Sequence, residues 1–159
     1  MPRKVFWGLL AGAVVLTSIW HLQTQLNYRA FVHLAQGLRL SVADAALEET
    51  PERVRVRFTV VLTNSTERAI PVEGTSCLLY AGQEFLGPCV ISSDAPAVVP
   101  PQGEWRIDVI TEITGHYLEN YRKVEADGVR VQGSVQIALP LGSDSIKAMR
   151  RFSELIPKR

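Results

Sequence analysis

Two cysteines, Cys77 and Cys89, are the residues whose spacing predicts a definite covalent bond. A hairpin that turns at Gly82-Gln83-Glu84 sets Tyr80 against Leu86, and the same register sets the two cysteines opposite each other. Opposed residues in an antiparallel pair share a face, with Cβ atoms about 4.5–5.5 Å apart. A disulfide then needs little adjustment. The spacing therefore predicts a disulfide here. The alternative is two buried free thiols, which a register error of one residue would leave apart.

Three arginines at alternate positions are the next candidates for chemistry. Arg53, Arg55 and Arg57 lie along one predicted strand, so their guanidinium groups share one face. Such a stripe is a candidate site for an anion or a lipid headgroup. The simpler interpretation pairs the arginines with Asp108 and Glu112 on a neighbouring strand, where each pair contributes only tenths of a kcal/mol.

The C-terminal segment 147–159 carries five basic residues, and Glu154 is its single acidic residue. Lys147, Arg150 and Arg151 are therefore candidates for contact with anionic headgroups or with an acidic partner. A solvated terminus is the commoner case. The pattern leaves both interpretations open.

No catalytic, cofactor or metal site is predicted. The chain has no glycine-rich phosphate loop after a strand and no Gly-x-Ser-x-Gly elbow. His21 and His33 are twelve residues apart without a carboxylate partner, and two cysteines are too few for a four-ligand zinc site. His116 has no nucleophile that spacing identifies, so we expect it at the surface. The formal charge of +1 excludes a broad basic surface for nucleic acid.

An uncharged stretch near the N-terminus predicts a membrane anchor. Val5–Trp20 has no charged residue, and with the next two residues it would span about 27 Å as a helix. Arg3 and Lys4 precede it, which predicts a cytoplasmic N-terminus and an extracytoplasmic C-terminal domain at the cell membrane. A cleaved secretory signal is the alternative. No small-x-small pair follows the stretch, which favours an uncleaved, single-pass anchor.

Four residues of this stretch have expected roles in the membrane. Trp7 and Trp20 lie near its two ends, where amphipathic rings prefer the headgroup level. Gly8 and Gly12 have the small-xxx-small spacing that lets a second helix approach closely. We therefore hold a homo-oligomer through this helix as one hypothesis, beside a membrane or envelope protein as partner.

The residues that follow predict a helical stalk and then strands. Leucine and alanine recur every four residues as far as Gly37, a natural residue to end a helix. Beyond it the apolar period falls to two, which is typical of strands with one buried face. Antiparallel strands at this spacing favour an immunoglobulin-like or fibronectin-like sandwich. The runs are 38–42, 54–62, 75–80, 85–91, 105–113 and 129–139.

Two segments depart from the alternating pattern. Gly115–Asp127 has helical spacing, and an inserted helix there would cover one open end of the sandwich. Asp94–Gly103 is too rich in proline for a central strand. The domain organisation is then a cytoplasmic tip and anchor over 1–22, a stalk over 23–37, the sandwich over 38–142 and a basic tail over 143–159. The tail is ambiguous between helix and strand.

The order of four motifs resembles the late embryogenesis abundant type 2 family, with its water-stress and hypersensitive-response relatives. The resemblance spans about residues 38–140. It implies a β-sandwich, often tethered by one N-terminal helix, without a known active site and associated with stress tolerance. The Asn-Pro-Asn usual in the family is Asn64-Ser65-Thr66 here. The motifs are a strand ending in asparagine (58–64), a hairpin (79–87), a Pro-Pro-Gln-Gly segment (100–103) and a late strand with an internal glycine, Gly133.

The sequence therefore predicts a non-enzymatic, single-pass membrane protein that displays a β-sandwich outside the cytoplasm for binding or scaffolding. The lipid bilayer and a membrane or envelope protein are its expected partners, and nucleic acid is not. Two alternatives remain: an accessory subunit that packs through its transmembrane helix, and a peripheral lipid-binding module.

Overall fold

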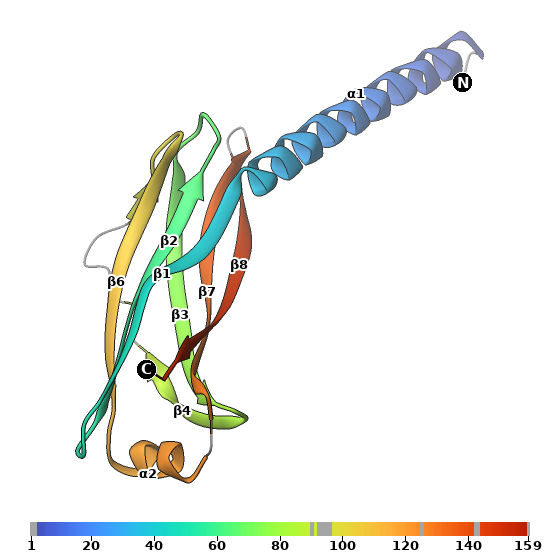
Figure 1. The fold of residues 1–159 in the computed structure, drawn as a ribbon. Coiled ribbons are helices and arrows are strands. Elements are labelled where there is room, and N and C mark those ends of the chain that lie inside the picture. Colours follow the sequence, from blue (N-terminus) through green and yellow to red (C-terminus); the bar gives the residue numbers. More distant parts are fainter. Residues whose placement is uncertain (1–2, 90, 92–96, 125, 142–143, 159) are drawn as a thin grey trace. The chain divides into compact units, whose positions relative to one another are not determined.

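The computed structural model describes residues 3–89, 91, 97–124, 126–141 and 144–158 (Figure 1). Within these ranges the side chains of residues 3–6, 8–11, 140–141 and 144 lie outside the description. The chain divides into two compact units, residues 1–36 and 37–159. Each unit is described by itself.

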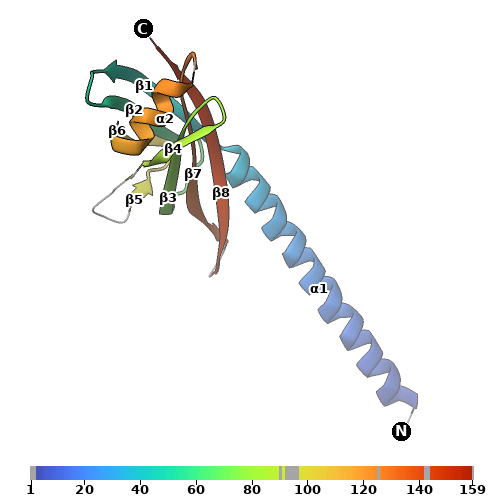
Figure 2. The same cartoon turned by 90° about the horizontal axis from the view of Figure 1, so that it is seen from below.

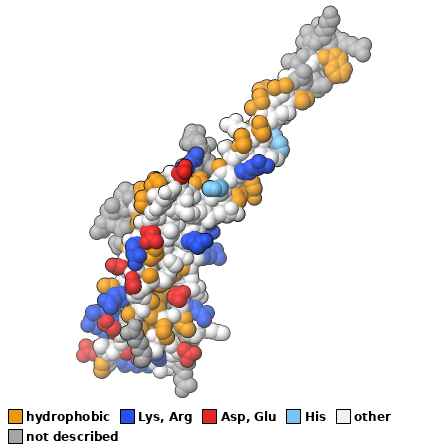
Figure 3. Space-filling view, turned by 45° about the horizontal axis from the view of Figure 1, so that its top comes forward, with side chains coloured by type: hydrophobic (Ala, Val, Ile, Leu, Met, Phe, Trp, Pro, Cys, Tyr) orange, Lys and Arg blue, Asp and Glu red, His pale blue; other side chains and the backbone are white. Residues whose placement is uncertain are grey.

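The first unit is one helix, α1 (Arg3–Gln36). The predicted anchor and the predicted stalk are therefore continuous, and the helix ends directly before Gly37, as expected. Along the middle of α1 the side chains of residues 12–29 are exposed. Figure 3 shows hydrophobic side chains distributed along this segment.

The structure does not support the predicted transmembrane anchor. In the part of the chain that it describes, no helix is long and apolar enough to cross a membrane. The physical reason is that polar residues interrupt the apolar run of α1. The first of them are Thr17, Ser18 and His21. The side chains of 3–6 and 8–11, on which the first half of that prediction depends, are among those not described.

The second unit confirms the predicted antiparallel two-sheet sandwich (Figures 1 and 2). The first sheet has the order β1-β2-β6. The second has the order β4-β3-β7-β8, and β5 pairs with β3. The strands are β1 (Leu38–Glu49), β2 (Val54–Asn64), β3 (Ile70–Ala81), β4 (Glu84–Cys89), β5 (Ala97–Val99), β6 (Gly103–Ile113), β7 (Gly128–Leu141) and β8 (Asp144–Pro157).

The core lies between the sheets and follows the alternation of the sequence. Phe58 on β2 and Leu79 on β3 are almost fully buried, as is Ile137 on β7. Each such side chain contributes about 1.5–3 kcal/mol relative to leaving it exposed. The period of two therefore indicated the core-facing residues of β2 and β7 correctly, whereas Leu40 on β1 and Ile107 on β6 are only half-buried.

Helix α2 (Gly115–Lys123) is the inserted helix, and it covers one end of the sandwich (Figure 1). It ends four residues before Asp127, because Val124 has an extended backbone. Leu118 and Tyr121 are its buried residues. The predicted helix is thus confirmed in place but is shorter than its helical spacing suggests.

The predicted basic tail is part of the second sheet. Strand β8 pairs with β7 from Gly128 opposite Pro157 to Leu141 opposite Asp144. Phe152 and Ile156 on this strand are buried. Their spacing of four residues fits either a helix or a strand. The segment forms a strand because β7 is available as its pairing partner.

The proline-rich segment is an edge element where it is described. Residues 97–99 form the short strand β5, which pairs with the start of β3. Residues 92–96, which include the first part of the predicted Asp94–Gly103 loop, lie outside the described residues. The expectation that this segment is not a central strand is therefore met in its described part.

Candidate functional site

The β3–β4 hairpin holds the predicted disulfide. Cys77 and Cys89 are opposite each other, bonded, with Cα atoms 5.1 Å apart. The predicted register is wrong nearer the turn, where Tyr80 faces Phe85 and not Leu86. A two-residue turn with Gly82 at φ +58° shortens the connection, and a bulge before Gly87, at φ +118°, restores the register at the cysteines.

The two faces of this hairpin are chemically different. Cys77, Leu79 and Cys89 point into the core and are buried. On the outer face Phe85 packs against Tyr80, with ring centroids 5.7 Å apart, and edge-on against Tyr117 of α2, with centroids 5.8 Å apart. Phe85 and Tyr117 remain 39% and 38% exposed.

Further side chains extend this aromatic group across the outer face of the sheet. Tyr80 is opposite Arg130 on β7, and Arg130 is opposite the exposed Leu155 on β8. Leu78, two residues before Tyr80, is also exposed. We call this surface the hairpin patch; its residues are Leu78, Tyr80, Phe85, Tyr117 and Arg130. Among the described residues, no carboxylate forms an ion pair with Arg130.

The predicted arginine stripe is largely occupied by ion pairs. Arg53 and Arg55 reach the same carboxylate oxygen of Glu112, at 3.0 and 2.8 Å. The hydrogen bond from Arg55 is the main cause of a lowered pKa of Glu112. Asp108, the other predicted partner, accepts instead from the hydroxyl of Thr59 at 2.6 Å. The simpler interpretation is therefore correct for Arg53 and Arg55.

The remaining arginine of the stripe differs. Arg57 is exposed and lies opposite the exposed Ile110 on β6. In the described part of the chain it forms no ion pair. A single guanidinium group does not make the predicted three-residue anion stripe.

The basic residues of β8 do not gather into one site either. Lys147 forms an ion pair with Glu73 at 2.9 Å. Arg150 and Arg151 are consecutive in a strand, so their side chains point to opposite faces. Lys147 and Arg151 share one face of β8 and Arg150 lies on the other, so the three candidates for headgroup contact do not form one cluster.

Asn64, at the end of β2, is a structural residue whose environment sequence reasoning did not foresee. Its side chain is 1% exposed and donates to the carbonyl oxygens of Arg68 at 2.7 Å and Pro100 at 2.9 Å. Its oxygen accepts from the backbone N–H of Thr66 at 3.0 Å and from the Thr66 hydroxyl at 2.7 Å. All the hydrogen-bonding capacity of the amide is thus used to join two turns.

Contacts of α2 with the β1–β2 turn were also not foreseen. The hydroxyl of Tyr121 donates to the carboxylate of Glu49, and the Arg122 guanidinium donates to the carbonyl oxygen of Pro51. Burial, with Glu49 adding to it, raises the pKa of Tyr121 well above its usual value. No local spacing relates residues 72 apart, so only the fold could bring this pair together.

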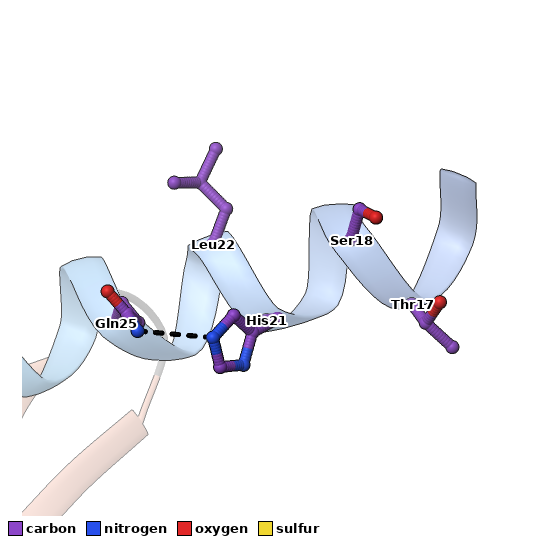
Figure 4. Close-up of a pocket in the computed structure, with 5 residues that line it drawn as sticks. All are labelled: Thr17, Ser18, His21, Leu22 and Gln25. Atoms are coloured by element: carbon purple, nitrogen blue, oxygen red, sulfur yellow. Dashed lines mark hydrogen bonds between the residues drawn. The ribbon is translucent and has the colours of Figure 1, made fainter. Parts of the chain in front are cut away.

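The histidines lie in exposed positions without converging ligands. His116 Nε2 accepts a hydrogen bond from the side-chain amide N–H of Asn120 at 3.3 Å, and His21 Nε2 accepts one from that of Gln25 at 3.1 Å (Figure 4). Across the residues that the structure describes, no three His, Cys, Asp or Glu side chains are grouped to hold a metal ion.

The predicted interface residues of α1 are placed only in part. Trp7 and Trp20 are exposed, and an added Cβ at Gly12 would meet nothing within 4 Å. Gly8 lies in the helix, one turn before Gly12. Trp7, Gly12 and Trp20 are therefore not buried within their own unit.

Comparison with known proteins gives a likeness of fold. No family model matches the chain, and no curated protein does. The X-ray structure of the structural genomics target SoR45 is similar, with a TM-score of 0.50 and 15% identity over 78% of this chain and 90% of that chain. The fold is shared.

Two other solved structures are similar over much of the chain. A crystal structure of a protein from Archaeoglobus fulgidus has a TM-score of 0.46 and 12% identity, over 76% of this chain and 98% of that chain. The solution structure of a putative late embryogenesis abundant protein has a TM-score of 0.39 and 13% identity, over 92% of this chain and 86% of that chain.

Proposed function

We propose that this chain is a non-enzymatic, stress-related binding module that works outside the cytoplasm and holds a protein partner on the hairpin patch. The observation that carries the proposal is the hairpin itself: its inner face is fixed by a buried disulfide, while its outer face exposes aromatic side chains. A rigid element that presents exposed aromatic groups suits recognition.

The composition of the patch favours a protein as the partner. Tyr, Phe and Arg are enriched in protein interfaces, where they supply most of the binding energy. We expect the partner to place an acidic group beside Arg130. Removing the Arg130 guanidinium group from water without a counter-charge would oppose binding. We therefore expect a partner surface with an apolar centre and a carboxylate beside it.

The relation to stress proteins rests on the order of the four motifs that resemble the late embryogenesis abundant type 2 family. Two residues of those motifs have definite structural roles here. Asn64 joins two turns, and Gly133 lies where an added Cβ would overlap the ring of Phe152. These roles support the resemblance because they explain why a sandwich of this kind needs those residue types there.

The disulfide supports a location outside the cytoplasm, since most cells keep cytosolic thiols reduced. Thiol trapping in intact cells tests this location. Acid quenching followed by maleimide labelling should leave Cys77 and Cys89 unlabelled until a reductant is added. Labelling of both thiols without reductant would contradict it. Fractionation of the same cells shows whether the chain sediments with membranes.

A complementation experiment tests the role of the patch. Cells that lack the protein should be sensitive to water stress, and the full chain should restore growth. Phe85→Ser should fail to restore it, whereas Val98→Ser, an exposed apolar residue on β5, should succeed. Equal restoration by both variants would contradict the proposal.

A further inference from the structure

Helix α1 carries more exposed apolar surface than an isolated helix in water would retain. Of the large hydrophobic side chains that are exposed in the described part of the chain, about half lie on this helix, and those on its middle turns are each more than 50% exposed. Large contiguous apolar surfaces indicate an interaction. The spacing of these side chains indicates what covers them.

The apolar side chains include a regular seam. Gly12, Val15, Ile19, Leu22 and Leu26 follow one another at intervals of three, four, three and four residues. An interval that averages 3.5 residues is the period of helices that pair as a coiled coil. We call these five residues the α1 seam; Gly8 continues its spacing toward the N-terminus.

Polar residues avoid the seam. Every polar residue between positions 12 and 27 lies off it, among them Thr17, His21 and Thr24. Figure 4 shows Leu22 pointing to one side of the helix while His21 and Thr17 point to the other. A lipid environment alone would not require this 3.5-residue period.

The hydroxyl groups on this stretch have their partners within the helix. Thr17 donates to the carbonyl oxygen of Ala13 at 2.9 Å, Ser18 to that of Val14 at 2.8 Å and Thr24 to that of Trp20 at 2.9 Å. Covering the helix therefore leaves these hydroxyls satisfied. These three hydroxyls do not oppose burial of the neighbouring seam.

We propose that α1 pairs in parallel with α1 of a second copy of this chain through the α1 seam. Self-pairing fits the charges, since the seam and its flanking positions from 12 to 28 carry none and two copies meet without repulsion. At the centre of the seam, β-branched Ile19 is followed by Leu22, an order that favours two-stranded parallel pairs; Val15 and Leu26 on either side are apolar but do not repeat that order. Gly12 lets the two backbones approach closely.

Cysteine crosslinking of the full chain, in the cells that express it, tests this pairing. The two natural cysteines are bonded to each other, so one introduced cysteine reports on the pair. Val15→Cys, Ile19→Cys, Leu22→Cys and Leu26→Cys should each give an oxidised dimer of about twice 17.6 kDa on a non-reducing gel. Thr17→Cys and Thr24→Cys are matched controls that face away and should give at least tenfold less.

Dimer yield that follows the 3.5-residue period supports the pairing. Three results would overturn it: no dimer at any seam position, equal yield at seam and control positions, or dimers confined to a single position, as an antiparallel pair gives. A bilayer or an unrelated protein covering the seam produces the first result. The outcome does not depend on the hairpin patch, because no residue of the patch lies on α1.

Discussion

At the scale of single residues, Asn64 is expected to be the most sensitive polar position of the sandwich. Asn64→Ala removes four hydrogen bonds from a side chain that is 1% exposed, among them those to the carbonyl oxygens of Arg68 and Pro100. We expect a loss of about 2–4 kcal/mol in the free energy of unfolding, measured by urea denaturation. Thr63→Ala, next to it and half-buried, removes only the hydrogen bond to Glu104 at 3.3 Å and should change the value by less than about 0.5 kcal/mol. Equal effects would show that the amide network is not stabilising.

Tyr121 gives the stability a dependence on alkaline pH. Burial and Glu49 raise its pKa in the folded chain, so above a pH of about 10 the unfolded chain loses this proton first. The stabilisation from Tyr121 is complete below that pH and is lost as the pH rises further.

Comparison with Tyr121→Phe measures this effect. At neutral pH the variant should be less stable by about 1–2 kcal/mol, because the hydroxyl no longer donates to Glu49. Between pH 9 and 11 the difference between the two proteins in urea titrations should shrink. A difference that stays constant over this range would show that the hydroxyl does not titrate as described.

Gly133 is expected to tolerate no side chain. An added Cβ would overlap Phe152 and the carbonyl oxygen of Ser76. Gly133→Ala should therefore lower the free energy of unfolding by about 1–3 kcal/mol or more. Gly74→Ala is the matched control, because nothing lies within 4 Å of its Cβ position. Thermal unfolding of both variants checks the prediction; a Gly133→Ala variant as stable as Gly74→Ala would contradict it.

At the scale of elements, the disulfide should stabilise the hairpin and through it the second sheet. Replacing Cys77 and Cys89 together by serine should lower the free energy of unfolding by about 2–3 kcal/mol. Reductant should lower the stability of the wild type by a similar amount and leave the double variant unchanged. If reductant lowered the stability of the double variant as well, its effect on the wild type could not be assigned to this disulfide.

The sequence was informative about elements wherever one local pattern was sufficient. The alternation around Phe58 and Ile137 predicted strands and their buried faces, and the spacing of the cysteines predicted their pairing. The turn at Gly82 was predicted one residue too long, because a bulge beside Gly87 is compatible with the same cysteine register. The strand β8 was ambiguous, because only its partner β7 decides between helix and strand.

The candidate site was less predictable than the fold. Side chains alternate along a strand, so an inward-facing Cys77 implies that Leu78 and Tyr80 face outward. This signal could have located the hairpin patch. The approach of Tyr117 to Phe85 could not be inferred, since it depends on where α2 lies at the end of the sandwich. Long-range pairs such as Tyr121 with Glu49 have no local signature for the same reason.

At the scale of the whole molecule, the two units have separate proposed roles. The helix pairs with a second copy through the α1 seam, and the sandwich binds a partner through the hairpin patch. Pairing two copies would present two patches together, and a partner with two matching surfaces would then bind far more tightly than to one copy. The seam variant Leu22→Arg should weaken such binding without altering the affinity of a single sandwich.

The most direct test of the central claim is photo-crosslinking from the hairpin patch in intact cells. A full chain with a photoreactive benzoylphenylalanine in place of Phe85 should give one discrete adduct with another protein. The same group in place of Val98 should not, and Arg130→Glu should reduce the Phe85 adduct at least tenfold. Absence of an adduct at position 85, or equal adducts at both positions, would contradict a binding role for this surface.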